Sequence, residues 1–120
     1  MEKKTKKSQK QGMKQNGSQR IERKYSKDQS KCRITFWLPR EFAPEARCIA
    51  VAGSFNGWNQ YSHLLSKLEN GELSLVVEVE AGREYEFRFI IDETRWENAS
   101  NADRYVWSDI GNCENSVIVT

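Results

Sequence analysis

The chain of 120 residues has the length of one small domain, and its 19 basic and 17 acidic residues are divided unevenly. Residues 1–31 carry a net charge of +8, and residues 32–120 a net charge of −6. No stretch approaches the ~18 apolar residues of a membrane span, and no apolar segment follows the basic N-terminus as in a secretory signal. Three scattered cysteines and one histidine predict neither a disulfide framework nor a metal site. We therefore expect reduced thiols, a cytoplasmic location and no cofactor.

Residues 1–31 are rich in Lys, Gln, Ser and Gly, with Met13, Ile21 and Tyr25 as almost the only apolar side chains. So few apolar groups cannot offset the entropy lost on ordering, which predicts a disordered basic tail followed by a folded domain at 32–120. The tail has one aromatic residue and no Arg-Gly repeats. This composition favours a solubilising role, and any nucleic-acid contact is expected from the tail alone.

From residue 32 onward, apolar and polar residues alternate with a period of two, which is typical of half-buried β-strands. Asn-Gly, Ala-Gly and Gly-Asn pairs between these runs predict turns. No segment shows a helical period. The sequence therefore predicts an all-β fold, an immunoglobulin-like antiparallel β-sandwich of about seven strands. The segments with clear strand character span residues 32–38, 48–52, 72–80, 84–92 and 117–119.

Catalytic residues are hard to find in this pattern. His63 lies in a polar loop and is expected to be exposed, whereas Cys32 and Cys48 lie in apolar strands and are expected to be buried and inert. Cys113 is placed in a loop. The acidic residues of 72–80 and 84–92 alternate as on a solvated sheet face. Two catalytic carboxylates about 5–10 Å apart can be recognised only in space, but a domain this small favours a protein that is not an enzyme.

The four tryptophans are more informative: Trp37, Trp58, Trp96 and Trp107. Trp58 follows an Asn-Gly turn that projects it outward. Tryptophans of this kind either cap the ends of a sandwich or form a binding surface. The apolar face of a pyranose ring packs on an indole, and its hydroxyls need hydrogen-bonding neighbours. Because the predicted domain is acidic, an uncharged polymer fits it better than nucleic acid.

Four segments carry a resemblance to a known family, in the order VAGSFNGWN at 51–59, AGREYEFRFIID at 81–92, WEN with AD at 96–98 and 102–103, and NSVIV at 115–119. The chain resembles the isoamylase early-set domains, the carbohydrate-binding modules of family 48. This group includes the glycogen-binding domain of the AMP-activated protein kinase β subunit. The likeness covers residues 32–120 and is strongest to small stand-alone bacterial members without a catalytic barrel.

The resemblance implies non-catalytic binding of α-1,4-glucan, as glycogen, starch or a maltooligosaccharide, on one face of the sandwich. Trp58 and Trp96 would form a cradle of stacking surfaces for the curved chain. Arg88 would donate hydrogen bonds to sugar hydroxyls, and Asn115, opening the last strand, would bond them through its amide. A hydrophobic loop residue of the family corresponds to Ile110.

The sequence departs from the family pattern at three places. Ala99 follows Asn98 where relatives often carry Asp, the turn at 93–95 is one residue longer than in the kinase domain, and residues 111–114 replace a Gly-Gly-Glu segment. Two alternative functions stay open. One is a scaffold or regulatory module that packs on a kinase or a glycogen-metabolising enzyme without measurable glucan binding. The other is an accessory domain of a glycoside hydrolase.

Overall fold

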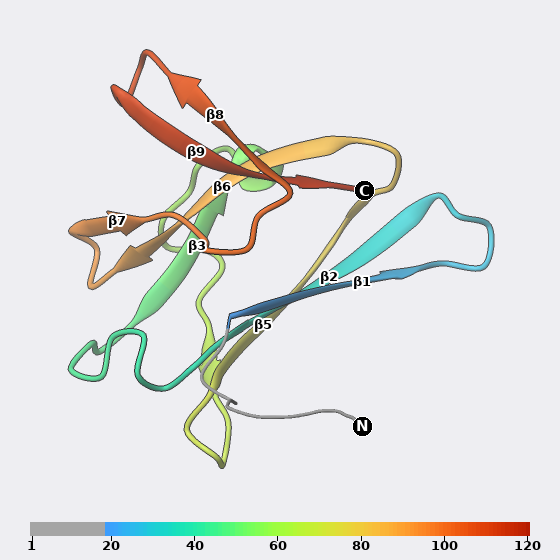
Figure 1. Ribbon diagram of the computed structural model, residues 1–120. Coiled ribbons are helices and arrows are strands. Elements are labelled where there is room, and N and C mark those ends of the chain that lie inside the picture. The colour runs from blue at the N-terminus through green and yellow to red at the C-terminus, as the bar shows by residue number, and fades with distance from the viewer. Residues whose placement is uncertain (1–18) are drawn as a thin grey trace, which may run out of the picture.

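The computed structural model describes residues 19–120, and almost every regular element in that range is a strand (Figure 1). A single 3-10 turn, Ser54–Asn56, interrupts them. The same range contains no helix with the length and apolar character needed to cross a membrane. The strands are β1 Arg20–Tyr25, β2 Lys31–Leu38, β3 Ile49–Gly53, β4 Ser66–Lys67, β5 Leu73–Glu80, β6 Glu84–Ile91, β7 Arg95–Glu97, β8 Arg104–Ser108 and β9 Cys113–Val119.

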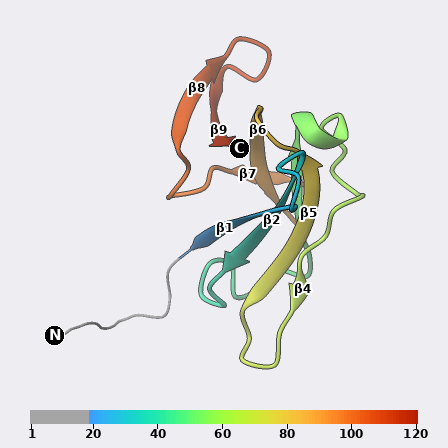
Figure 2. The same cartoon turned by 90° about the vertical axis from the view of Figure 1, so that its right-hand side faces the viewer.

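Two antiparallel sheets face each other as the layers of a sandwich (Figures 1 and 2). The first sheet has the order β1-β2-β5-β4, and the second has the order β3-β6-β9-β8, with β7 paired to β6. The predicted all-β sandwich is confirmed. It has nine strands rather than about seven because β4 and β7 are only two and three residues long, too short to show a period, and because β1 lies in the segment predicted to be a tail.

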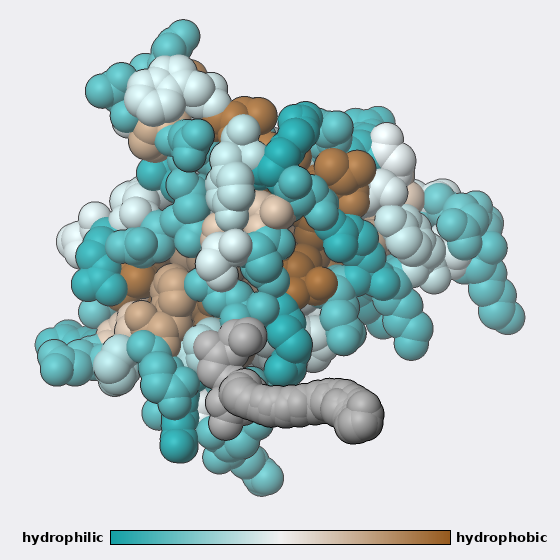
Figure 3. Space-filling view, viewed as in Figure 1, coloured by the Kyte–Doolittle hydropathy of each residue, from teal (hydrophilic) through white to brown (hydrophobic). Residues whose placement is uncertain are grey.

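The core lies between the sheets and follows the predicted alternation. Cys32, Ile34, Phe36 and Leu38 of β2 are all buried, while the residues between them lie toward solvent. Phe36 packs edge-to-face against Phe87 of β6, with ring centroids 5.2 Å apart. Aromatic pairs in this geometry stabilise a core beyond the area that they bury. In the view of Figure 1, hydrophilic side chains cover most of the surface (Figure 3).

The disorder predicted for residues 1–31 is wrong for residues 20–31, which form β1 and the turn into β2. Ile21 packs against the core, and the polar side chains of β1 contact the end of the chain. Arg23 Nε donates to the carbonyl of Val119 (2.8 Å), and Tyr25 Oη donates to the carbonyl of Thr120 (2.8 Å). Arg23 also pairs with Asp103. Polar contacts therefore order a segment that has little apolar surface. The rest of the predicted tail, residues 1–18, lies outside the described residues.

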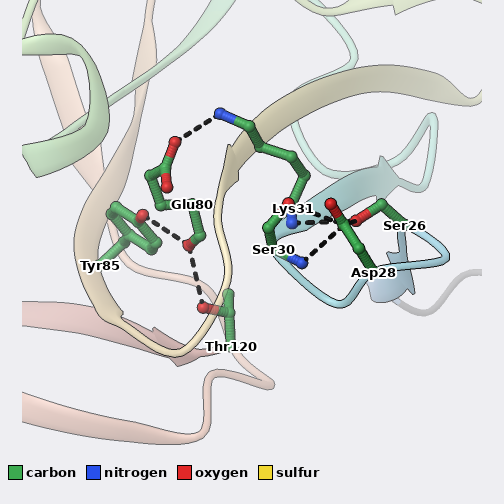
Figure 4. Close-up of polar contacts among 7 residues, drawn as sticks. All are labelled: Ser26, Asp28, Ser30, Lys31, Glu80, Tyr85 and Thr120. Carbon is green, nitrogen blue, oxygen red and sulfur yellow. Dashed lines mark hydrogen bonds and ion pairs between the residues drawn. The ribbon is translucent and has the colours of Figure 1, made fainter.

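The turn between β1 and β2 is built around the Asp28 carboxylate (Figure 4). This group accepts hydrogen bonds from Ser26 Oγ (2.7 Å), from Ser30 Oγ (2.7 Å) and from the Ser30 backbone N–H (3.0 Å). These donors favour the charged form, so they lower the pKa of Asp28 to about 2. Beside the turn, Lys31 at the start of β2 pairs with Glu80 at the end of β5. The Glu80 carbonyl accepts from Tyr85 Oη on β6, which belongs to the other sheet (2.8 Å).

We expect this turn to lose stability in acid. The folded-state pKa of Asp28 lies below the ordinary value of 3.8, so its contribution to folding is present above 3.8 and is lost as the pH falls toward about 2. The measurement is the free energy of unfolding of the wild type and of Asp28→Asn at pH 6 and at pH 2. The wild type should be the more stable protein at pH 6, and the difference should shrink at pH 2. An equal difference at both pH values would contradict this account.

We also expect Arg23→Ala to lower the free energy of unfolding by about 1–2 kcal/mol, since a charge-assisted hydrogen bond and an ion pair are lost from a partly exposed side chain. Urea denaturation gives the value. The matched control is Lys24→Ala, which removes a cation from the next residue of β1, on the opposite face of the strand. If both variants lose the same stability, the contacts of Arg23 with the chain end are unimportant.

Candidate functional site

Trp58 and Trp96 lie side by side although they come from different elements. Their ring centroids are 6.5 Å apart, and the ring planes are inclined by 34°. Trp58 follows the 3-10 turn after β3, whereas Trp96 is the central residue of β7. Both indoles are half-buried. The structure therefore brings together the two residues that the sequence predicted as a cradle, and each ring keeps part of its surface open to solvent.

The loop that carries Trp58 is held by the side chain of Asn56. Its Oδ1 accepts from the Gly53 backbone N–H (3.0 Å), and its Nδ2 donates to the Val51 carbonyl (3.1 Å). Gly57 and Trp58 both have left-handed backbone angles, with φ of 65° and 60°. Glycine adopts this conformation easily, but tryptophan does not, so the loop must hold Trp58 in place. A backbone hydrogen bond from the Trp58 N–H to the Gly53 carbonyl (2.8 Å) contributes to this.

Gly53 lets β3 approach β6 closely at the start of this loop. A Cβ atom at Gly53 would lie 2.3 Å from the carbonyl oxygen of Glu86 and 2.9 Å from Phe87 Cβ. No residue with a side chain fits there without a backbone shift. The glycine of the sequence motif therefore has a packing role, since it fixes where the Trp58 loop begins.

Trp96 is positioned by the β6–β7 hairpin. It lies opposite Ile90 in the register of the two strands, so both side chains share the outer face of the second sheet. At the turn, Asp92 Oδ1 accepts from the backbone N–H groups of Cys48 (3.0 Å) and Arg47 (2.8 Å), and these bonds lower the pKa of Asp92. The longer turn at 93–95 still places the Trp96 indole beside Trp58.

Arg88 lies on the same outer face, as its position in the alternation of β6 predicted. Its guanidinium carbon is 4.8 Å from the centroid of the Trp96 ring, within the range of a cation–π contact. Its Nε is buried and has no hydrogen-bond partner among the described residues. The tip of the β8–β9 hairpin is near: a Cβ atom at Gly111 would lie 3.4 Å from an Arg88 terminal nitrogen. Ile110, also at this tip, is fully exposed.

Asn115 lies on β9 beside β6, but it does not open the last strand as expected, because β9 begins at Cys113. The side chain is 4% exposed. Its Nδ2 donates to Glu86 Oε1 (3.0 Å), while its Oδ1 is buried without a partner among the described residues. The antiparallel β6–β9 register places Glu86 opposite Val117. Arg88, two residues after Glu86, and Asn115, two residues before Val117, therefore share the outer face.

The other residues considered in the sequence have different surroundings. His63, expected to be exposed, is half-buried: its ring packs against Phe55 with centroids 5.3 Å apart, and its Nδ1 lies 3.0 Å from Asn56 Nδ2. Its role is therefore structural, in the loop that carries Trp58. Cys32 is buried as expected, whereas Cys48 is only half-buried. Cys113 is half-buried and is the first residue of β9, not part of a loop.

Two tryptophans lie away from this face. Trp37 is half-buried on the outer face of the first sheet, covered by the Arg20 guanidinium at 4.7 Å. Trp107 on β8 is 60% exposed and lies on the opposite side of its sheet from Arg88, because it alternates with Val106, the partner of Asn115. Within residues 19–120, no three His, Cys, Asp or Glu side chains form a group that could hold a metal ion.

The sequence did not predict Glu86 as a site residue, because its place in the alternation of β6 is typical of a solvated sheet face. Its alternation with Arg88 was visible in the sequence, but its bond to Asn115 joins residues 29 positions apart and was not. The packing of His63 against Phe55 and its contact with Asn56 were also not predicted, because they depend on how the loop that carries Trp58 folds. The structure thus places four predicted residues on one face, and the face also contains Glu86. The four are Trp58, Arg88, Trp96 and Asn115.

Comparison with family models gives the class of the protein: residues 40–120 match the family described as the glycogen recognition site of AMP-activated protein kinase. The chain belongs to this family, and with it to the carbohydrate-binding modules. A search of the curated proteins found no match. The matched segment contains every residue of the candidate site and begins after β1 and β2.

We expect Asn56→Asp to destabilise the fold by about 1–3 kcal/mol, because the carboxylate can still accept from Gly53 but cannot donate to the buried carbonyl of Val51. Asn59→Asp is the matched control. Its Oδ1 accepts from the Tyr61 N–H (2.8 Å), a bond that aspartate retains. Chemical denaturation of both variants measures the difference. Equal loss in the two would show that the negative charge, and not the lost donor, causes the effect.

Proposed function

We propose that this protein binds α-1,4-glucan without catalysis, and that glucose rings stack on Trp58 and Trp96. The single observation that carries the proposal is the geometry of the two indoles, 6.5 Å between centroids and inclined by 34°. Two flat surfaces at such an angle suit a chain that curves, as an α-1,4-linked glucan does. The membership in a glycogen recognition family supports this choice of polymer.

The surrounding side chains support an uncharged ligand. Arg88 and Asn115 have a donor and an acceptor to offer to sugar hydroxyls, and Glu86 balances the charge of Arg88 on the same face. Residues 19–120 together carry a net charge of −3. A polyanion such as a nucleic acid needs a basic groove to neutralise its phosphates. A neutral polysaccharide needs no such groove, and the face fits it better.

We expect weak binding from a site of this size. Stacking of a base on an aromatic side chain contributes about 1–3 kcal/mol, and an aliphatic sugar face belongs at the lower end of that range. Removing one indole should then reduce affinity by about tenfold, which corresponds to ~1.4 kcal/mol. The two indoles of the cradle are the stacking surfaces on which this estimate depends.

The test is calorimetric titration with maltoheptaose, together with electrophoresis through gels that contain glycogen. Trp58→Ala and Trp96→Ala should each weaken maltoheptaose binding about tenfold and abolish the retardation by glycogen. Trp107→Ala is the matched control, since it removes an exposed indole from the opposite side of the sheet and should leave both readouts unchanged.

Two results would overturn the proposal. One is a wild type that migrates through glycogen like Trp58→Ala. The other is a Trp107→Ala variant that loses as much affinity as the variants of the cradle. Incubation with amylopectin tests the non-catalytic part, because new reducing ends would identify a hydrolase.

A further inference from the structure

Glu86 contacts Asn115 of the candidate site, although the sequence motifs did not predict it as a binding residue. It lies on β6, two residues before Arg88, and is half-buried. Its backbone N–H donates to Ser54 Oγ (3.1 Å), which ties this part of β6 to the loop that leads to Trp58. Glu84, two residues earlier on the same face, has a different environment: it is exposed and pairs with Arg104.

The carboxylate of Glu86 determines which way the amide of Asn115 faces. A carboxylate can only accept hydrogen bonds, so the atom 3.0 Å from Glu86 Oε1 must be the amide nitrogen of Asn115. The amide oxygen is then held on the other side. Since Asn115 is 4% exposed, its side chain has little freedom to adopt another rotamer.

This orientation leaves two buried polar atoms unpaired on one face. Within residues 19–120 they are Asn115 Oδ1, an acceptor, and Arg88 Nε, a donor. Buried polar groups normally have partners, and leaving them unpaired costs free energy. A hydroxyl group can accept from the one and donate to the other. A phosphodiester anion has no proton to donate to Asn115 Oδ1, so it satisfies only Arg88.

We propose that Glu86 is a positioning residue of the glucan site, which orients Asn115 so that its Oδ1, together with Arg88 Nε, receives a neutral sugar hydroxyl. The inference rests on the proposed function. Without Glu86 the amide of Asn115 is free to turn and present its nitrogen beside Arg88. Two donors would then face the ligand, and one of the two bonds to the hydroxyl would be lost.

The experiment is a double-mutant cycle read by the Kd for maltoheptaose. Glu86→Ala should weaken binding about three- to tenfold, the factor expected for one lost hydrogen bond. In the Asn115→Ala background, Glu86→Ala should have no further effect, because Glu86 acts through Asn115. Glu84→Ala is the matched control, since it removes a carboxylate from the same face of the same strand and should leave the Kd unchanged.

Because Asn115 is buried, its replacement by alanine can disturb folding, so thermal unfolding is measured for each variant. Glu86→Gln provides a second test in which Asn115 is unchanged. Glutamine can turn either end of its amide to Asn115, so the side-chain amide resonances of Asn115 should shift or double in the nitrogen–proton NMR spectrum. In the wild type, one set of these resonances should move on addition of maltoheptaose.

The outcomes separate this inference from the proposed function. If Trp58→Ala weakens binding and Glu86→Ala does not, the glucan site stands and the positioning role is wrong. Additive losses in the double variant would also overturn it, because they would show that Glu86 acts independently of Asn115. A wild type that binds no maltoheptaose overturns the proposed function and this inference together.

Discussion

Strand β6 pairs with β3, β7 and β9, so the core and the candidate site both depend on its position. Its alternation buries Phe87 and Phe89 between the sheets and places Glu86 and Arg88 on the outer face. The close approach at Gly53 fixes β3 against this strand, with no room for a Cβ atom beside the Glu86 carbonyl. A larger residue there would displace β3 and, with it, the loop that holds Trp58.

The central part of the second sheet is buried on both faces, which is unusual for an antiparallel sheet. Ala50, Ala52, Ile90 and Val117 are at most 3% exposed, yet they lie outside the core between the sheets. Trp96 lies opposite Ile90 on this outer face, and Trp58 lies against Trp96. Trp96 therefore lies beside an apolar side chain of this outer face, and Trp58 is joined to that face through its contact with Trp96. A side chain held in place by its neighbours loses less entropy when it binds a ligand.

The parts of this structure that depend on local sequence could be predicted, and the parts that depend on distant contacts could not. The alternation of β6 and the Asn-Gly turn before Trp58 are local, so the outward position of Arg88 and the projection of Trp58 followed from them. Strand β1 has little apolar surface, and its side chains bond carbonyls 95 and 96 residues away. Glu84 and Glu86 have the same place in the alternation, and only their neighbours on other strands distinguish them.

Because β1 is part of the folded domain, the charges of the chain must be divided at a different residue. The basic segment beyond the described residues, 1–18, has a net charge of +5, and residues 19–120 have −3 rather than the −6 assigned to a domain that began at residue 32. Three cations of the predicted tail are in ion pairs with acidic residues later in the chain: Arg20 with Glu72, Arg23 with Asp103 and Lys31 with Glu80. Part of the acidity of residues 32–120 is therefore offset by cations of this segment. On the candidate face Glu86 and Arg88 carry opposite charges, so the five residues of the candidate site have no net charge together.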